Sequence, residues 1–384
     1  MKKAIMALSG GMDSTSLLLR LLREGYSVSC ISYEYGQKHR IEIDRAKVNV
    51  QYLKSFNLPI EQKIVDLSSA MVIFNSSLIE GGKDIPEGHY EEKQMKSTVV
   101  PNRNAIFSSI LYGYALSIAS KSSENVIIAL GVHSGDHAIY PDCRPEFYTS
   151  LEHAFSIGNW DSELVKIDLP YIDGDKESIL RDALKSCDEL GLDFDLIFSN
   201  TNTSYNPDEM GRSSGKSGAD IERILAFNAI NRKDPVEYTD DWNTVLQNAL
   251  DVERKHKDEY YREKLTELQY MVTRQAATER PFTGEYNSEK RKGIYKCICC
   301  EHELFSSSGK YDSGCGWPAF HSELNSAEIT RIDDFSMGMV RTEVICSKCD
   351  AHLGHVFNDG PTAFGGERYC INSASLIFEE DDEV

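Results

Sequence analysis

Short apolar runs alternate with longer amphipathic segments along the N-terminal half of the chain. The apolar runs predict buried strands at residues 4–8, 26–33, 61–66 and 125–131. The amphipathic segments predict helices at residues 17–22, 41–56, 105–121 and 176–190. Strands that alternate with helices at this spacing are typical of a doubly wound α/β fold with a parallel sheet. In such a fold, ligands bind beyond the carboxyl ends of the strands.

A strongly charged segment, residues 240–269, follows this half. Its apolar residues recur at near-helical spacing, which predicts one or two amphipathic connecting helices. We interpret its charges as a solvated connector rather than a binding surface. The acidic end of the chain, residues 379–384, is expected to form a disordered tail.

The turn after the first predicted strand reads Ser-Gly-Gly-Met-Asp-Ser-Thr. Free N–H groups in such a turn, together with the positive end of the following helix, favour a bound phosphate. Glycines allow the backbone to approach closely, and the hydroxyls add donors. The spacing differs from that of the P-loop, and the segment resembles the PP-loop of the N-type ATP pyrophosphatases. We therefore expect ATP to bind at Ser9, Gly10, Gly11, Met12, Asp13, Ser14 and Thr15.

The net charge of −20 argues against nucleic acid as a direct partner, because binding a phosphate backbone requires a basic surface. No apolar run approaches the ~20 residues of a membrane span, and the apolar start is too short for a signal peptide. Seven of the ten cysteines lie between Cys297 and Cys370, which favours a metal site plus redox chemistry over a disulfide framework. We expect a cytoplasmic protein.

Polar residues follow the later predicted strands of the first half. Arg103 and Arg144 are suited to bind carboxylate or phosphate groups with their forked guanidinium donors. Asp142 and Glu146 can accept hydrogen bonds from a purine-like edge. These residue types predict a site for a small anionic, purine-like molecule.

Several motifs in order, YEYGQKH, PEGHY, VPNRN, GVHSGDHAIYPDCRPEF and INRKDP, closely resemble the 7-cyano-7-deazaguanine synthase (QueC) family. The resemblance covers roughly residues 1–238. It implies that a deazaguanine substrate contacts Tyr35, Gln37, His39, Arg103, Asn104, His133, Asp136, Asp142, Arg144 and Glu146.

The resemblance also implies a reaction. ATP converts 7-carboxy-7-deazaguanine into an acyl-adenylate, and an amine displaces AMP to give an amide. In the standard enzyme the amine is ammonia, and a second ATP-dependent round produces the nitrile. Asp13 is a candidate Mg²⁺ ligand. Lys176 either reaches the phosphates or remains a solvated surface lysine.

The sequence departs from the family at four zinc-binding cysteines, which are replaced by Ser204, Ser214, Ser217 and Asp220. Three hydroxyls and one carboxylate do not replace four thiolates for zinc, so we expect no zinc in this domain. The loop is then either mobile or held by hydrogen bonds.

Three interpretations of the first domain stay open. It is a synthase with a zinc-free brace, a ligase that joins the deazaguanine to an amine of a partner protein, or a nucleobase-binding module without turnover. Some defence-associated QueC-like proteins from anti-phage operons resemble the second. Members of the family often dimerise, so a homodimer is also among the expectations.

Two Cys-x-x-Cys pairs occur near the C-terminus. Each pair can occupy a knuckle turn and give two thiolates to one tetrahedral ion. The spacing predicts a closed structural zinc site made by Cys297, Cys300, Cys346 and Cys349.

The segments TERPF, SGCGWP, AHLGHVFNDG and RYCINS around these pairs resemble the methionine-R-sulfoxide reductase (MsrB) family over residues 262–380. The resemblance implies a small antiparallel, mainly-β domain, in agreement with short runs bounded by Gly and Pro. It also implies that Cys370 attacks the sulfoxide sulfur of oxidised methionine and that Cys315 resolves the sulfenic acid as a disulfide. A thioredoxin-like reductant then reduces that disulfide.

The same resemblance assigns further roles. His352 and His355 bind or protonate the sulfoxide oxygen. Arg368 and Asn372 orient the site, and Trp317 forms a wall for the substrate methyl group. We therefore expect a QueC-like domain at residues 1–238, a helical connector at 239–265 and an MsrB-like domain at 266–380.

Overall fold

A computed structural model describes residues 2–38, 41–79, 81–82, 84, 86–133, 135, 139–204, 208, 210–338 and 340–381. The chain forms two compact units, residues 1–253 and 254–384. The division falls within a long helix, α9 (Trp242–Lys264), which lies in the segment that we expected to connect two domains. Within the described residues, no helix combines the length and apolar character needed to cross a membrane.

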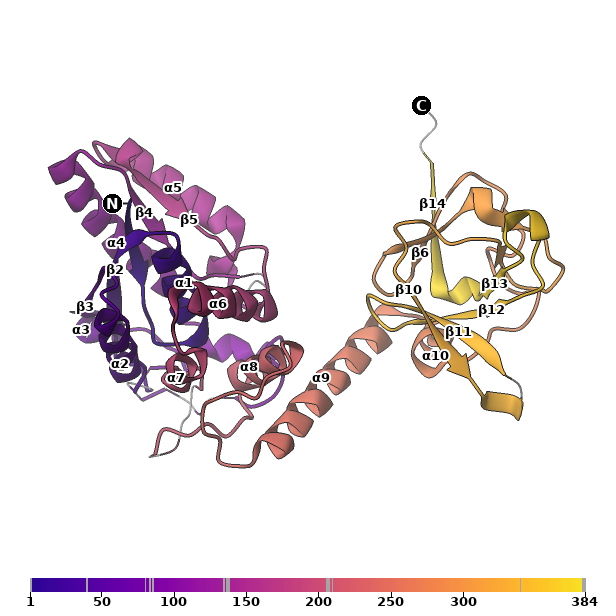
Figure 1. Cartoon of the computed structure of the whole chain (residues 1–384), viewed down its shortest axis with the longest axis horizontal. Helices are drawn as coiled ribbons and strands as arrows, with labels where there is room; N and C mark the ends of the chain where they lie inside the picture. Colours follow the sequence, from indigo (N-terminus) through magenta and orange to yellow (C-terminus); the bar gives the residue numbers. More distant parts are fainter. Residues whose placement is uncertain are drawn as a thin grey trace. The chain divides into compact units, whose positions relative to one another are not determined.

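The N-terminal unit is built on a five-stranded sheet with the strand order β3-β2-β1-β4-β5, and every neighbouring pair is parallel. Its strands are β1 (Lys2–Ala7), β2 (Tyr26–Glu34), β3 (Ile60–Asp66), β4 (Val126–Ala129) and β5 (Val165–Asp168). Its helices are α1 (Met12–Arg23), α2 (Ile41–Ser55), α3 (Ser68–Met71), α4 (Arg103–Ser122), α5 (Pro145–Gly158), α6 (Lys176–Leu190), α7 (Phe194–Ser199) and α8 (Gly218–Ala229). The predicted doubly wound parallel fold is confirmed (Figure 1).

Alternate residues of the central strand β1 enter two separate cores. Ala4 and Met6 pack with α1, α2, α6, α7 and α8, whereas Ile5 packs with α4 and α5. The strand is therefore buried on both faces, which explains its continuous apolar run. The chain order reverses between β1 and β4, and at such a switch point the strand ends open a crevice for ligands.

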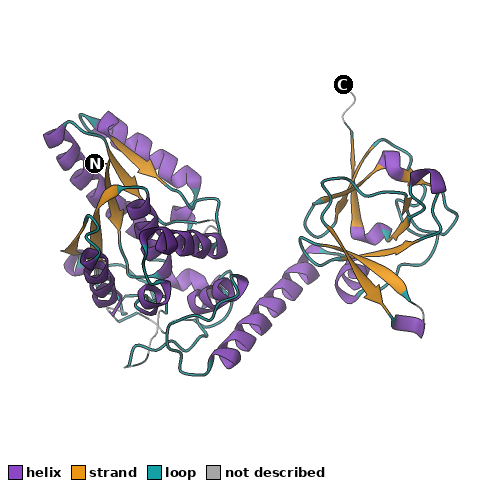
Figure 2. Cartoon of the chain, viewed as in Figure 1, coloured by secondary structure: helices purple, strands orange, loops and turns teal. Residues whose placement is uncertain are grey.

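The C-terminal unit is mainly β, as predicted (Figure 2). One antiparallel sheet has the order β10-β11-β12-β13-β9-β8, and a second has the order β14-β6-β7. The strands are β6 (Gly293–Cys297), β7 (Glu303–Ser306), β8 (Lys310–Tyr311), β9 (Ala319–Phe320), β10 (Ile329–Asp334), β11 (Arg341–Cys346), β12 (His352–Phe357), β13 (Arg368–Ile371) and β14 (Leu376–Glu380). The helix α10 (Glu267–Gln275) precedes them.

One expectation for this unit is wrong. The acidic end of the chain is not disordered from Glu379, because Glu379 and Glu380 belong to β14 and pair with Ile294 and Gly293 of β6. Glu379 and Glu380 are both exposed at the end of an edge strand whose Leu376 enters the core.

Candidate active sites

The phosphate loop connects β1 to α1. Gly10 has φ +90°, and a Cβ at this position would lie 2.2 Å from the carbonyl oxygen of Glu42, so only glycine fits. Ser9 Oγ accepts a hydrogen bond from the N–H of Gly11 at 3.2 Å and lies 2.9 Å from Ser14 Oγ. Because the N-cap of α1 is Gly11, no N-cap side chain competes with an anion for the first N–H groups of the helix.

A cavity of about 270 Å³ opens at this loop, close to the lower end of the range for small-molecule sites, roughly 300 Å³. It lies beside the ends of β1, β2 and β4, where the chain order reverses. The cavity brings together ten of the predicted residues: Ser9, Gly11, Met12, Asp13, Ser14, Tyr35, Gln37, Arg103, Asn104 and Lys176.

Other predicted residues lie elsewhere. Arg144 and Glu146 are exposed at the start of α5 and do not line the cavity. Two more, His39 and Asp136, fall outside the described residues. Four other predicted residues do not line the cavity. Gly10, Thr15 and His133 are buried, and Asp142 adjoins the lining residue Cys143 in the sequence.

Charged side chains converge at the Asp13 end of the cavity. Lys176 Nζ lies 3.1 Å from Asp13 Oδ2 and 3.5 Å from Glu222 Oε2. The buried His133 places Nε2 3.8 Å from the same Asp13 oxygen. Burial acts to raise the pKa of Asp13, but the positive charge of Lys176 and the contact with His133 lower it overall. Asp13 is therefore a carboxylate at neutral pH.

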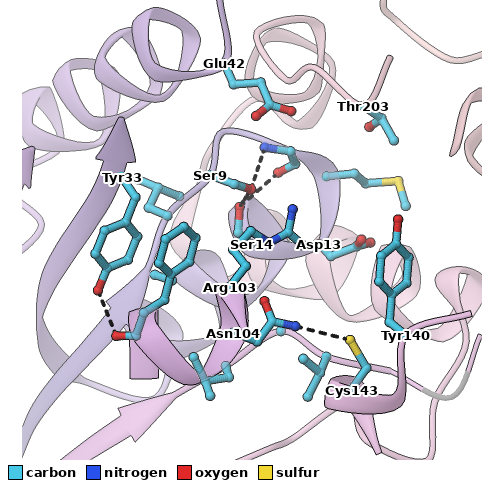
Figure 3. Close-up of a pocket in the computed structure, with 18 of the residues that line it drawn as sticks. Ser9, Asp13, Ser14, Tyr33, Glu42, Arg103, Asn104, Tyr140, Cys143 and Thr203 are labelled. Carbon is cyan, nitrogen blue, oxygen red and sulfur yellow. Dashed lines mark hydrogen bonds between the residues drawn. The ribbon is translucent and has the colours of Figure 1, made fainter. Parts of the chain in front are cut away.

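The opposite side of the cavity has aromatic walls. The rings of Tyr33 and Phe107 stack with centroids 3.9 Å apart, and Tyr35 meets Phe107 edge to face. Asn104 Nδ2 lies 3.6 Å from Cys143 Sγ on the adjacent wall (Figure 3). Flat apolar walls with a few amide and hydroxyl groups suit a planar heterocycle.

Sequence analysis missed two acidic residues of this cavity, Glu42 and Glu222. Burial raises the pKa of Glu42 to about 8, although Arg103 and a hydrogen bond with Asn202 oppose the shift. Figure 3 shows Glu42 pointing toward the cavity. Each shares its helix with another acidic residue, Asp44 in α2 and Asp220 in α8, so the sequence offered no local signal that set either apart.

The four positions where the QueC resemblance implies zinc-binding cysteines differ in their hydrogen bonds. Asp220 is buried, and its carboxylate accepts hydrogen bonds from Ser217 Oγ at 2.7 Å and Ser204 Oγ at 3.3 Å. In return, Ser217 Oγ accepts from the N–H of Asp220 and caps α8. Ser214 is half-buried, and within the described part of the chain its hydroxyl accepts from the N–H of Lys216 in its own turn. Of the two alternatives for this loop, its described residues 204 and 213–220 support the hydrogen-bonded one.

The start of α8 is also fixed by a buried ion pair. Arg223 forms two hydrogen bonds to Asp234, of 2.6 and 2.9 Å, and a third to Thr201 Oγ at 2.7 Å. Both charged side chains are almost completely buried, so each needs the other. Arg223 thus points away from the cavity that Glu222, its neighbour in sequence, lines.

In the C-terminal unit, four cysteines form one cluster. Their sulfurs all lie within 4.8 Å of one another, and the pairs Cys297–Cys349 and Cys300–Cys346 are each 3.6 Å apart. A tetrahedral zinc ion with bonds of about 2.3 Å requires sulfurs about 3.8 Å apart. The cluster therefore fits the predicted zinc site.

The predicted catalytic cysteines adjoin each other. Cys370 lies on β13, and its Sγ is 3.6 Å from Cys315 Sγ. Burial and the neighbouring Cys315 raise the pKa of Cys370 to about 12, although Arg368 opposes the shift. Burial also acts on Cys315, but hydrogen bonds with Ser313, Trp317 and Cys370 lower its pKa overall. The pair can form a disulfide with little movement of either side chain.

Two histidines, His352 and His355, belong to β12. His355 pairs with Cys370 across β12 and β13, and the centroid of the His352 ring lies 5.6 Å from that of His355. His352 Nδ1 lies 2.5 Å from Glu343 Oε1, and His355 Nε2 lies 2.9 Å from Asp334 Oδ2. Burial lowers the pKa of His352, although the Glu343 carboxylate opposes the shift. The carboxylates orient both imidazole rings.

The segment after Cys370, residues 372–374, is held by Glu279 and by the backbone carbonyl of Leu353. Sequence analysis noted Glu279 within the TERPF motif but assigned it no role. Asn372 Oδ1 accepts from the N–H of Glu279, and Asn372 Nδ2 donates to Leu353 O. The Glu279 carboxylate accepts from two consecutive N–H groups, at Ser373 and Ala374.

The remaining predicted residues frame the site. Trp317 Nε1 donates to the carbonyl of Glu279 at 3.0 Å. Arg368 forms a bidentate pair with Asp359, with both bonds 2.8 Å long. The predicted catalytic residues of this unit thus lie on or beside β12, β13 and the segment 313–318, apart from the four zinc-site cysteines.

Comparisons with known proteins agree with this division of the chain. Residues 3–231 match the family model "Queuosine biosynthesis protein QueC", and residues 265–380 match the SelR domain. The 7-cyano-7-deazaguanine synthase of Pseudoalteromonas translucida is 44% identical over 237 residues, which are 62% of this chain and 99% of the relative. The 7-cyano-7-deazaguanine synthase 2 of Colwellia psychrerythraea is 42% identical over 240 residues, 62% of this chain and 100% of the relative.

The C-terminal unit has its own relatives. The peptide methionine sulfoxide reductase MsrB of Hahella chejuensis is 57% identical over 128 residues, which are 33% of this chain and 91% of the relative. The chain therefore belongs to the QueC family through its N-terminal unit and to the MsrB family through its C-terminal unit.

Proposed function

We propose that the chain is a bifunctional enzyme. Its N-terminal unit uses ATP to activate 7-carboxy-7-deazaguanine and forms a C–N bond, first as an amide and then as a nitrile. Its C-terminal unit reduces methionine-R-sulfoxide in peptides. The observation that carries the first activity is one cavity lined both by the phosphate loop and by the packed aromatic rings of Tyr33, Tyr35 and Phe107. Relatives of both units bear names that match these activities.

The proposed activation step joins the substrate carboxylate to the α-phosphate of ATP and releases pyrophosphate. Backbone N–H groups in the first turn of α1 and the hydroxyls of Ser9 and Ser14 hold the pyrophosphate, and Lys176 neutralises part of its charge. Arg103 is the guanidinium that lines the same cavity and suits the substrate carboxylate. An amine nitrogen then attacks the acyl carbon, AMP departs, and the amine proton passes to solvent.

Asp13 supports the expected use of Mg²⁺. Its Oδ1 is buried and has no hydrogen-bond partner among the described residues, and its lowered pKa keeps it ionised. A carboxylate oxygen in this state fits a hard divalent cation. When bound with ATP, Mg²⁺ supplies charge neutralisation at the phosphates.

In the C-terminal unit, we propose that the sulfur of Cys370 attacks the sulfoxide sulfur. The sulfoxide oxygen takes up protons with help from His352 and His355, and methionine leaves a sulfenic acid on Cys370. Cys315 then displaces water from that sulfenic acid and forms a disulfide, 3.6 Å being the starting separation of the two sulfurs. A thioredoxin-like protein restores both thiols.

The four-cysteine cluster supports zinc as a structural ion of this unit. The donor set is Cys297, Cys300, Cys346 and Cys349, and its sulfur spacing leaves no position for a substrate. When bound, zinc links the knuckle after β6 to the knuckle after β11.

Mass spectrometry tests the first activity. The purified chain is given ATP, Mg²⁺ and 7-carboxy-7-deazaguanine, once with ammonium and once with the protein products of neighbouring genes. Free nitrile with ammonium supports the synthase. A mass increment on a partner protein with little nitrile indicates the ligase, in which a protein amine takes the place of ammonia. Binding of the base without AMP formation contradicts both and leaves a binding module.

The second activity is tested by following the conversion of methionine-R-sulfoxide to methionine within a peptide. The Cys370→Ser variant is expected to lose all turnover, whereas Cys315→Ser completes one turnover with thioredoxin and then stops as a sulfenic acid. A single turnover by Cys370→Ser contradicts the assigned nucleophile.

A further inference from the structure

Glu222 has no role in the reaction as proposed so far, yet it occupies a prominent position. It lies in the first half of α8 and lines the cavity at the phosphate-loop end. Its side chain is about one-fifth exposed, and its Oε1 lies beside Gly135. The helix that presents Glu222 is fixed by the Ser217–Asp220 cap and the Arg223–Asp234 pair. Its position is therefore well determined.

Glu222 and Asp13 approach the same point from different elements. Lys176 Nζ lies between them, 3.1 Å from Asp13 Oδ2 and 3.5 Å from Glu222 Oε2. Two carboxylates thus share one ammonium group at a largely buried place, where Lys176 is only 11% exposed. The local charge is negative before any phosphate enters.

This arrangement conflicts with the binding of pyrophosphate alone. A carboxylate next to phosphate oxygens is repelled by them, and the low-dielectric surroundings strengthen the repulsion. A divalent cation between the carboxylates and the phosphates removes the conflict. Mg²⁺ is usually bound in proteins by one or two carboxylates together with substrate phosphates. The buried, unpartnered Asp13 Oδ1 is an independent sign that this corner serves a ligand.

We propose that Glu222 is the second carboxylate ligand of the Mg²⁺ that enters with ATP, with Asp13 as the first. Lys176 occupies the cation position in the free enzyme and is released to the phosphates when the ion arrives. The inference rests on the proposed function only in taking ATP as the co-substrate. It does not depend on which carboxylate or amine the enzyme uses.

Binding of Mn²⁺, a paramagnetic probe for Mg²⁺ sites, tests the proposal. The zinc-loaded full chain is titrated with Mn²⁺ in the presence of pyrophosphate, and free Mn²⁺ is followed by electron paramagnetic resonance. Glu222→Gln is expected to weaken pyrophosphate-dependent Mn²⁺ binding about tenfold, equivalent to about 1.4 kcal/mol. Glu222→Asp, which keeps the carboxylate, is expected to lose less.

Glu177→Gln is the matched control, since Glu177 adjoins Lys176 in sequence but is exposed and paired with Arg181. It is expected to bind Mn²⁺ as the unmodified chain does. Equal Mn²⁺ affinity for Glu222→Gln and the unmodified chain overturns the proposal, as does a lack of pyrophosphate-dependent binding in the unmodified chain. Normal Mn²⁺ binding without adenylation of the deazaguanine overturns the proposed function and leaves the Mg²⁺ assignment intact.

Discussion

Two clusters of side chains, four cysteines in the C-terminal unit and three polar residues in the N-terminal unit, hold a loop in place by opposite means. Cys297, Cys300, Cys346 and Cys349 gather four sulfurs within 4.8 Å, an arrangement of like groups that an ion must hold together. In the N-terminal unit, Ser204, Ser217 and Asp220 stand where the QueC resemblance places cysteines, and they bond directly to one another. Hydroxyl donors and a carboxylate acceptor complement each other without an ion.

The comparison concerns the stabilising free energy that a zinc site supplies beyond that of a hydrogen-bonded cluster. Four thiolates gain a very large binding free energy from zinc, whereas each buried hydrogen bond contributes only about 0.5–1.5 kcal/mol net. The hydrogen-bonded cluster recovers part of this by capping α8, the helix that carries Glu222 and Arg223. The stability of this hydrogen-bonded cluster is therefore linked, through α8, to the cavity that Glu222 lines.

Removal of zinc from the C-terminal unit is expected to have the largest effect. Cys346→Ser, or a strong chelator, should unfold this unit, because structural zinc supplies on the order of 10 kcal/mol of apparent folding free energy. Differential scanning calorimetry should show one transition lost and the N-terminal transition unchanged. Two unchanged transitions would contradict the role of the cluster.

Asp220→Ala is expected to have the next largest effect, and only on the N-terminal unit. It leaves the buried hydroxyls of Ser204 and Ser217 without their acceptor, which should cost about 2–4 kcal/mol of unfolding free energy. Urea unfolding measures the change. Asp195→Ala, which removes an exposed partner of Arg232, serves as the control and should shift the free energy by less than about 0.5 kcal/mol.

Two serines at positions where the QueC resemblance implies cysteines should differ in how much they contribute to the free energy of unfolding. Ser217→Ala removes the N-cap of α8 and should cost about 1 kcal/mol. Ser214→Ala removes only a contact within its own turn, at 3.3 Å, and should be close to neutral. Equal losses would show that the loop, rather than the cap, carries the stability.

The smallest expected effect is a difference between the two clusters in how their stabilising contribution changes with pH. Burial raises the pKa of Asp220 above its ordinary 3.8, so the folded state keeps this proton to a higher pH than the unfolded chain. Its contribution to stability is therefore full below pH 3.8 and declines as the pH rises through the folded pKa. Asp220→Asn should flatten this decline in urea titrations. Zinc binding strengthens in the opposite direction, since thiols must lose protons to bind the ion.

Features encoded by adjacent residues could be predicted from the sequence. The phosphate loop and the Cys-x-x-Cys pairs are such features, and α6 begins and ends at the expected Lys176 and Leu190. Glu42 and Glu222 could not be predicted, and Glu279 was noted only within the TERPF motif, because their roles depend on which face of an element the tertiary packing turns toward a site.

Two departures from expectation have the same origin. Arg144 was expected at the substrate because of its forked guanidinium donors, but it is exposed at the start of α5 and does not line the cavity, so its role in binding stays a prediction. Glu379 and Glu380 were expected to be disordered because they are acidic, yet backbone pairing with β6 decides their structure. Pairing and helix orientation are non-local properties, and no short window of sequence contains them.

The protonated state of Cys370 has a consequence for the selectivity of the C-terminal unit. With its pKa raised to about 12, this sulfur is a thiol at neutral pH, and thiols react slowly with dissolved peroxide and alkylating agents. In the proposed mechanism, it becomes a nucleophile only when a bound sulfoxide offers its oxygen to the departing proton. The proposed reductase would thus direct reducing equivalents to damaged side chains rather than to the oxidant that damaged them.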